Sequence, residues 1–141
     1  MKKIILSMTL LFVLLFSCTV FAAESSEDKP QWEYVTTSKD VKFYVDTNSN
    51  HIDIKNDDTV FFYMIRVNEK ENRLIGDKLS INSTTFRYRV EKSITYNIKT
   101  KEELSSNLTP SEWYLATKGS PIHKAIIILI EKLDNYGNYG K

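Results

Sequence analysis

Hydrophobic and polar residues alternate along several short stretches of the chain, which is the pattern of β-strands with one buried face. In the longest stretch, residues 86 to 98, one register is apolar and the other polar, with Lys92 as the only break. A helix would space its apolar residues three and four apart. The segment is therefore predicted to be a long strand, whose apolar register consists of Phe86, Tyr88, Val90, Ile94, Tyr96 and Ile98.

Further strands are predicted by the same criterion over residues 32 to 36, 41 to 46 and 77 to 82. Ser38 to Asp40 is short enough to join the first two as a hairpin, and Ser83 to Thr85 joins the third to the long strand. Residues 59 to 67 are apolar on both faces, as expected for a central strand that is covered on each side. Residues 99 to 110 are predicted to be a polar connection.

The apolar run from residue 119 to residue 130 begins with the signals of a helix start. Ser120 offers a hydroxyl that can cap free N–H groups, and Pro121 lacks the N–H that the first helical position does not use. The run is far shorter than the roughly 20 residues of a bilayer span. Its spacing favours an amphipathic helix on the sheet over a buried strand, with the apolar stripe Ile122, Ala125, Ile126, Leu129, Ile130 and Leu133.

Two isoleucines of this helix fall outside the stripe. Ile127 and Ile128 each share a ridge with polar residues four positions before and after, so both are expected to face away from the sheet. Either a loop or the N-terminal lead-in covers them, or they contact a partner. We therefore name them as candidate partner contacts.

The first 22 residues have the layout of a bacterial secretory signal peptide, with two lysines, an apolar stretch and a cleavage site that ends at Ala22. We expect export to the periplasm or the cell surface, with the mature chain beginning at Ala23. Cys18 leaves an alternative open, because Leu15 to Cys18 loosely imitates a site at which a lipoprotein cysteine is acylated. Under that alternative a lipid anchors the chain to the envelope.

The mature chain is predicted to form one domain without disulfide bonds. Cleavage after Ala22 removes the only cysteine and changes the net charge from +1 to −1. A balanced charge argues against nucleic acid as a partner, since nucleic-acid binders carry a clustered basic surface. Residues 23 to 31 are predicted to be a flexible lead-in, residues 32 to 134 the domain, and residues 135 to 141 a frayed tail.

A set of short motifs follows the predicted elements in order: Trp32 and Val35, Tyr44-Val45-Asp46, Thr59-Val60, Tyr88-Arg89-Val90, Pro110-Ser111-Glu112-Trp113 and Gly119-Ser120. This set resembles the surface-adhesin protein E family over nearly the whole mature chain. The resemblance implies an α+β fold, with a single antiparallel sheet of about six strands and a C-terminal helix packed on one face. We expect the motif residues to be structural, with Trp32 and Trp113 as core aromatics and Asp46 as the cap of the turn that follows it.

Members of that family usually carry one cysteine in the turn before the Tyr-Arg strand and another in the final helix. The matching positions here are Ser83 and Ile130, so packing has to replace the disulfide bond that the family places there. The resemblance implies that these two residues are neighbours in space.

The resemblance also implies an exported cell-envelope binding module, which recognises a host matrix protein or an envelope component. The alternative is a structural or assembly component of the bacterial cell envelope that acts through a homo-dimer or a partner chain. Arg87, Arg89 and Lys92 lie along the long strand and can form one basic strip that attracts acidic partners. The other interpretation of the strip is a solvated sheet face, which Glu91 interrupts.

The predicted mature sequence offers no catalytic or metal-binding constellation. It has no cysteine nucleophile, no glycine-rich phosphate loop and two histidines. His51 and Asp53 would share a face of a strand, but two ligands are too few for a metal site, and a solvated hairpin is the better interpretation. We therefore expect no enzyme, no metal and no cofactor.

Overall fold

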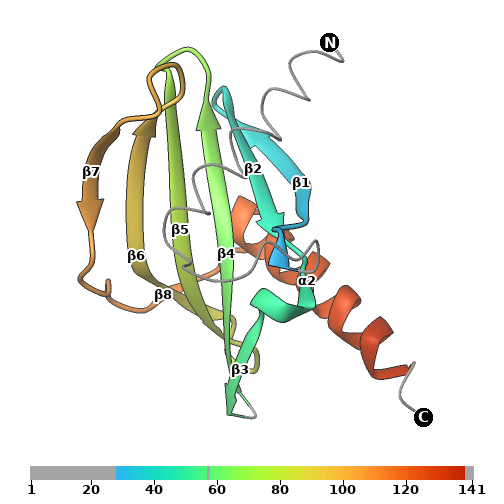
Figure 1. The fold of residues 1–141 in the computed structure, drawn as a ribbon. Coiled ribbons are helices and arrows are strands. Elements are labelled where there is room, and N and C mark those ends of the chain that lie inside the picture. Colours follow the sequence, from blue (N-terminus) through green and yellow to red (C-terminus); the bar gives the residue numbers. More distant parts are fainter. Residues whose placement is uncertain (1–27, 57, 139–141) are drawn as a thin grey trace.

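The computed structural model describes residues 28 to 56 and 58 to 138 of the chain (Figure 1). The predicted signal peptide, its cleavage site and Cys18 lie outside the described residues. The helical elements are the short 3-10 helix η2 (Ser49–His51) and the helix α2 (Pro121–Asn138). The strands are β1 (Trp32–Ser38), β2 (Val41–Asp46), β3 (Asp53–Asn56), β4 (Thr59–Asn68), β5 (Arg73–Asn82), β6 (Arg87–Asn97), β7 (Glu103–Asn107) and β8 (Tyr114–Leu115). In the described part of the chain, no helix combines the length and the apolar character that a membrane crossing requires.

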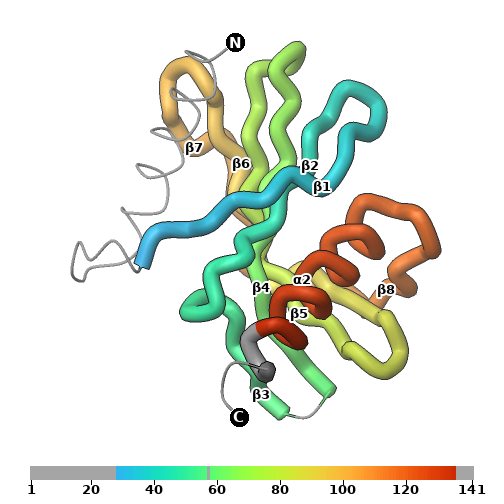
Figure 2. The backbone as a smooth tube through the Cα atoms, turned by 90° about the vertical axis from the view of Figure 1, so that its right-hand side faces the viewer, coloured from blue at the N-terminus to red at the C-terminus, as the bar shows by residue number. Residues whose placement is uncertain are grey.

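The strands form one curled antiparallel sheet with the order β1-β2-β4-β5-β6-β7, to which β3 adds beside β4 and β8 beside β6. α2 packs on one face at the β1 end of the sheet, while β7 forms the other end (Figures 1 and 2). The predicted α+β fold, an antiparallel sheet with a C-terminal helix on one face, is confirmed.

The main hydrophobic core lies between α2 and the sheet. The helix contributes Ala125, Ile126 and Leu129, each at most 3% exposed. They pack with buried side chains of β2, β4 and β5, namely Val45, Phe62, Met64, Leu79 and Ile81. Full burial of a large aliphatic side chain is worth roughly 1.5–3 kcal/mol, so this stripe holds the helix on the sheet.

Ile128 also packs against this core, so the expectation that it faces away from the sheet is wrong. Because α2 runs close along β1, the sheet covers more of the helix than the predicted stripe. Ile127 is 37% exposed, in agreement with the prediction for that residue. The helix continues to Asn138, into residues that were predicted to belong to a frayed tail. Gly137 does not stop it, since one glycine costs a helix only about 1 kcal/mol.

A β-bulge in β6 divides the apolar register that the sequence suggested. The pairing with β5 shifts by one residue between Lys92 and Val90, which leaves Glu91 as the extra residue. Before the bulge, Tyr88 and Val90 pack against the core under α2. After it, Tyr96 and Ile98 pack against a smaller cluster on the opposite face, formed by Ile65, Val67 and Leu74. The prediction of one shared face for residues 86 to 98 is therefore wrong, and Lys92 marks the place where the face changes.

The predicted polar connection contains a strand that was not predicted, β7, which pairs with β6 along the end of the sheet. All five residues of β7 are exposed. A strand without a buried face has no reason to alternate apolar and polar residues, so periodicity gives no sign of it.

Candidate functional site

The face of the sheet opposite α2 holds all three basic residues of the predicted strip: Arg87, Arg89 and Lys92. On β5, Leu79 belongs to the core under the helix, so its two neighbours point to the opposite face. These neighbours, Lys78 and Ser80, are the pairing partners of Lys92 and Arg89. The bulge lies between the two pairs, and it keeps Lys92 on the same face as Arg89 although they are an odd number of residues apart.

Two further lysines on this face lie over aromatic rings. The Lys78 Nζ is 5.2 Å from the centre of the Phe61 ring and 5.9 Å from that of Tyr63. The Lys55 Nζ, from β3, is 5.0 Å from the centre of the same Phe61 ring. Cations at this distance are attracted by the negative face of the ring. Phe61 is thus enclosed by two positive charges on neighbouring strands.

A fourth cation–aromatic pair lies at the β8 side of the same face. The guanidinium carbon of Arg89 is 5.1 Å from the centre of the Trp113 ring. Trp113 is 38% exposed, so its prediction as a core aromatic is wrong, while Trp32 packs against the smaller cluster of the sheet. Instead of packing in the core, the indole ring lies against the guanidinium group of Arg89.

Glu91, the bulge residue, is the acidic group that the sequence placed within the strip. Its carboxylate accepts hydrogen bonds from the Ser80 hydroxyl and from the Nε of Arg89, the latter at 2.7 Å. Burial alone would raise the pKa of Glu91. The hydrogen bonds from Ser80 and Arg89, together with the charges of Arg89 and Lys78, outweigh burial and hold this pKa below its ordinary value. Glu91 is therefore ionised and offsets part of the positive charge, as does Asp53 at the rim.

We call this surface the basic–aromatic face, which comprises the cations Lys55, Lys78, Arg87, Arg89 and Lys92 and the rings of Phe61, Tyr63 and Trp113. Sequence reasoning found the three basic residues on β6 and missed the rest. Residues 59 to 67 indicated a strand covered on both sides, whereas Phe61 and Tyr63 are only partly buried. The two lysines come from other strands, and only the cross-strand register brings them to these rings.

A polar hollow of about 400 Å³ adjoins this face, lined by Asn50, His51, Ile52, Asp53, Phe61, Tyr63 and Lys78. The Nδ1 of His51 bonds Asp46 rather than sharing a metal with Asp53. The buried Asp46 also accepts backbone N–H bonds from Gln31 at 2.8 Å and from Asn48 at 3.0 Å, which confirms its predicted role as a turn cap. Among the described residues no three histidine, cysteine, aspartate or glutamate side chains gather into a metal-binding group.

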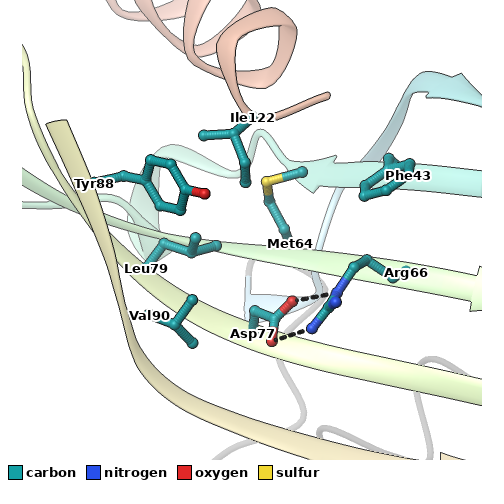
Figure 3. A pocket seen from close by; sticks show the side chains of 8 residues that line it. All are labelled: Phe43, Met64, Arg66, Asp77, Leu79, Tyr88, Val90 and Ile122. Atoms are coloured by element: carbon teal, nitrogen blue, oxygen red, sulfur yellow. Dashed lines mark hydrogen bonds and ion pairs between the residues drawn. The ribbon is translucent and has the colours of Figure 1, made fainter. Parts of the chain in front are cut away.

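A second hollow, of about 160 Å³, lies on the helix side of the sheet (Figure 3). Its walls are mostly apolar, and one side is bounded by the ion pair of Arg66 and Asp77. The Nε of Arg66 donates to one Asp77 oxygen at 2.8 Å and its Nη2 to the other at 3.1 Å. Ser93 donates its hydroxyl to Asp77 at 2.7 Å, so the buried carboxylate is held from both sides.

Ile127 and the basic strip do not form one surface. Ile127 is exposed on α2, and the helix lies on the face of the sheet opposite Arg87, Arg89 and Lys92. Of the predicted contact residues, the structure therefore brings together the three basic ones and separates them from the isoleucine.

Comparison of the chain with models of protein families, with curated proteins and with solved structures finds no match. The resemblance to the surface-adhesin protein E family therefore stays a prediction that depends on the motifs. Several motif residues have structural roles: Val45 is fully buried, and the Ser120 hydroxyl accepts the His123 N–H at 3.2 Å at the start of α2.

Proposed function

We propose that this chain is an exported binding module that recognises an acidic surface of another protein with its basic–aromatic face. The export part of the proposal depends on the signal-like first 22 residues. The resemblance to surface-adhesin protein E supports the same class of function. Under this proposal, the partner is a host matrix protein or an envelope component, and the chain binds it rather than catalysing a reaction.

The observation that carries the proposal is the arrangement of cations over exposed or half-exposed rings. Lys55 and Lys78 form no ion pair with any described residue, so their charges are available to a partner. A cation over an aromatic ring at an exposed site gains only about 0.5–1 kcal/mol, so it can turn to a carboxylate at little cost. Aromatic residues and arginine are also the side chains most enriched at protein interfaces.

Two features favour an acidic protein over a nucleic acid. The whole chain has a net charge of only +1, and Glu91 and Asp53 lie among the cations of the face. A phosphate backbone would meet these carboxylates along its length, whereas a protein can place its own carboxylates between them.

Binding to purified matrix proteins, measured by biolayer interferometry at several salt concentrations, tests the proposal. The variant Lys78→Glu/Arg89→Glu should lose binding, with a mainly slower association, because opposite charges steer the encounter. The control Lys118→Glu/Lys124→Glu makes the same charge change at exposed residues on the helix side and should bind as the unchanged protein does. An equal loss of binding in both double variants contradicts the proposal, and so does binding to DNA but to no protein.

The alternative of an assembly component is favoured by a different observation, at the β7 end of the sheet. β7 has no strand beyond it among the described residues, and exposed apolar side chains gather along β7 and β8. They are Leu104, Leu108, Tyr114 and Leu115, which are 50% to 68% exposed. An open edge with apolar side chains can pair with the same edge of a second copy. Concentration-dependent dimers in sedimentation that vanish in Leu104→Lys/Leu115→Lys support this alternative, and a monomer at all concentrations excludes it.

A further inference from the structure

The hollow on the helix side has the volume of a small molecule, about 160 Å³. Figure 3 shows its side chains converging from the sheet and from the helix: Phe43 from β2, Met64 and Arg66 from β4, and Ile122 from the start of α2. The strands β5 and β6 supply the remaining wall, with Asp77, Leu79, Tyr88 and Val90. Because every lining residue belongs to a strand or helix, the pocket is formed before any ligand arrives.

The pocket as a whole matches one ring in size. Its volume is about 160 Å³, and its floor includes Met64 and Leu79, each 1% exposed. A cavity of about 150 Å³ with aliphatic and aromatic walls is known to hold benzene. A compact apolar group of six or so heavy atoms, counted roughly from that precedent, therefore fills the space.

The polar side of the pocket offers a guanidinium group that is already oriented. Asp77 takes two of the five N–H donors of Arg66, which leaves donors for another acceptor. Asp77 itself is 5% exposed, and its oxygens already accept hydrogen bonds from Arg66 and Ser93. It therefore does not take up the other N–H donors of Arg66. The Arg66 side chain is 38% exposed, which keeps its remaining donors accessible from the pocket mouth. The planar donors of arginine suit an oxyanion such as a carboxylate.

A second polar group faces the same space from the other side. The Tyr88 hydroxyl points toward Met64 and Leu79 in Figure 3, and it makes no hydrogen bond with a described residue. Solvent reaches the Tyr88 hydroxyl, so it offers a polar contact at the edge of the pocket to a ligand that enters.

We propose that this pocket binds a small monocarboxylate with a compact apolar body, of which phenylacetate is the simplest probe. The ring lies over Met64, Leu79 and Val90 beneath Ile122, and the carboxylate meets the free donors of Arg66. Because Asp77 already balances the charge of Arg66, the carboxylate adds selectivity more than strength. For a ligand of this size, a dissociation constant on the order of 1 mM is expected.

Titration of the purified protein, followed through its methyl signals by NMR, tests the site with matched probes. Phenylacetate should shift Met64, Leu79, Val90 and Ile122 with one saturating curve. Acetate lacks the ring and 2-phenylethylamine carries the opposite charge, so each should bind about ten-fold more weakly or not at all, a difference of about 1.4 kcal/mol. Equal binding of 2-phenylethylamine, or no shift of these methyl groups, overturns the proposal.

Two variants locate the contacts. Arg66→Gln/Asp77→Asn keeps a hydrogen-bonded pair without leaving a buried carboxylate unpaired, and it should remove the preference for phenylacetate over the amine. Val90→Phe fills the pocket and should abolish binding of both. If either variant does not fold, the ligand series on the unchanged protein still decides. Shifts at Lys78 and Arg89 instead of the pocket would place the carboxylate on the basic–aromatic face, which contradicts this site and leaves the proposed function standing.

Discussion

The two faces of this sheet are made by the same strands and differ in what they contain. The face under α2 is a continuous apolar core, with the ion pair of Arg66 and Asp77 at its margin. The opposite face has a smaller apolar cluster at one end and cations over partly exposed rings at the other. Packing against the helix restricts the first face to apolar side chains. The second face can hold charged side chains, whose contribution to stability is small. The helix face therefore specifies the fold, and we propose that the opposite face is the one that contacts a protein partner.

Two adjacent phenylalanines on β4 should show the largest difference in stability between the two faces. Phe62 is fully buried under α2, so Phe62→Ala should cost about 3–5 kcal/mol of unfolding free energy. Phe61 is half-buried on the basic–aromatic face, and Phe61→Ala should cost clearly less while it weakens partner binding. Urea unfolding of both variants measures the difference. Equal costs would mean that both faces are core.

Loss of the ion pair on the helix face should have the next largest effect on stability. Asp77→Asn removes the charge that holds Arg66 and weakens the bond from Ser93, so it should cost about 2 kcal/mol, less than for a fully buried pair because Arg66 is partly exposed. Lys42→Gln, which breaks an exposed pair with Glu69, is the matched control and should change stability by less than about 1 kcal/mol. If the two variants are equally stable in urea, Asp77 does not hold this face together.

Much of this contrast was present in the sequence, but not its detail. The helix stripe and most strands were predictable because burial imposes a period on them, as with Ala125, Ile126 and Leu129. The bulge at Glu91 was not predictable, because a one-residue shift is a property of the pairing between β5 and β6 rather than of either strand. β7 had no period to detect, because it buries no side chain. Lys55 and Lys78 lie on opposite sides of Phe61 only through the strand register, which a sequence does not state.

The middle of α2 and the β5–β6 turn offer a smaller test, which bears on the family resemblance. If Ser83 and Ile130 are neighbours, Ser83→Cys/Ile130→Cys should form a disulfide on oxidation, since the bond needs Cα atoms about 5.5 Å apart. Closing this loop is worth roughly 4 kcal/mol in the chain-entropy model, less strain and the packing lost at Ile130, so we expect a modest rise in melting temperature. A thiol assay on the oxidised, folded protein checks the bond. Two free thiols there would remove the geometric support for the resemblance.

The smallest expected effect is on the pH dependence of stability, and it concerns Glu91. Because its pKa is lower in the folded protein than in the unfolded chain, Glu91 stabilises the fold at neutral pH, and this contribution is lost as pH falls below its ordinary value and through the lowered pKa. Glu91→Gln should therefore flatten the fall of stability between neutral and acidic pH. The same variant makes the basic–aromatic face more positive and should strengthen binding of an acidic partner. An unchanged stability profile in urea at both pH values counts against the role given to Glu91.

The central claim, that recognition belongs to the face opposite α2, is tested most directly by an NMR footprint of an acidic ligand. We would titrate the purified protein with a hexaglutamate peptide at low salt and follow the lysine and arginine side chains, the Trp113 indole and the methyl groups. The account predicts shifts at Lys55, Lys78, Arg89 and Trp113 that fade as salt is added, with the residues under α2 unchanged. Shifts at Lys118 and Lys124 of equal size, or at Arg66 alone, would contradict it.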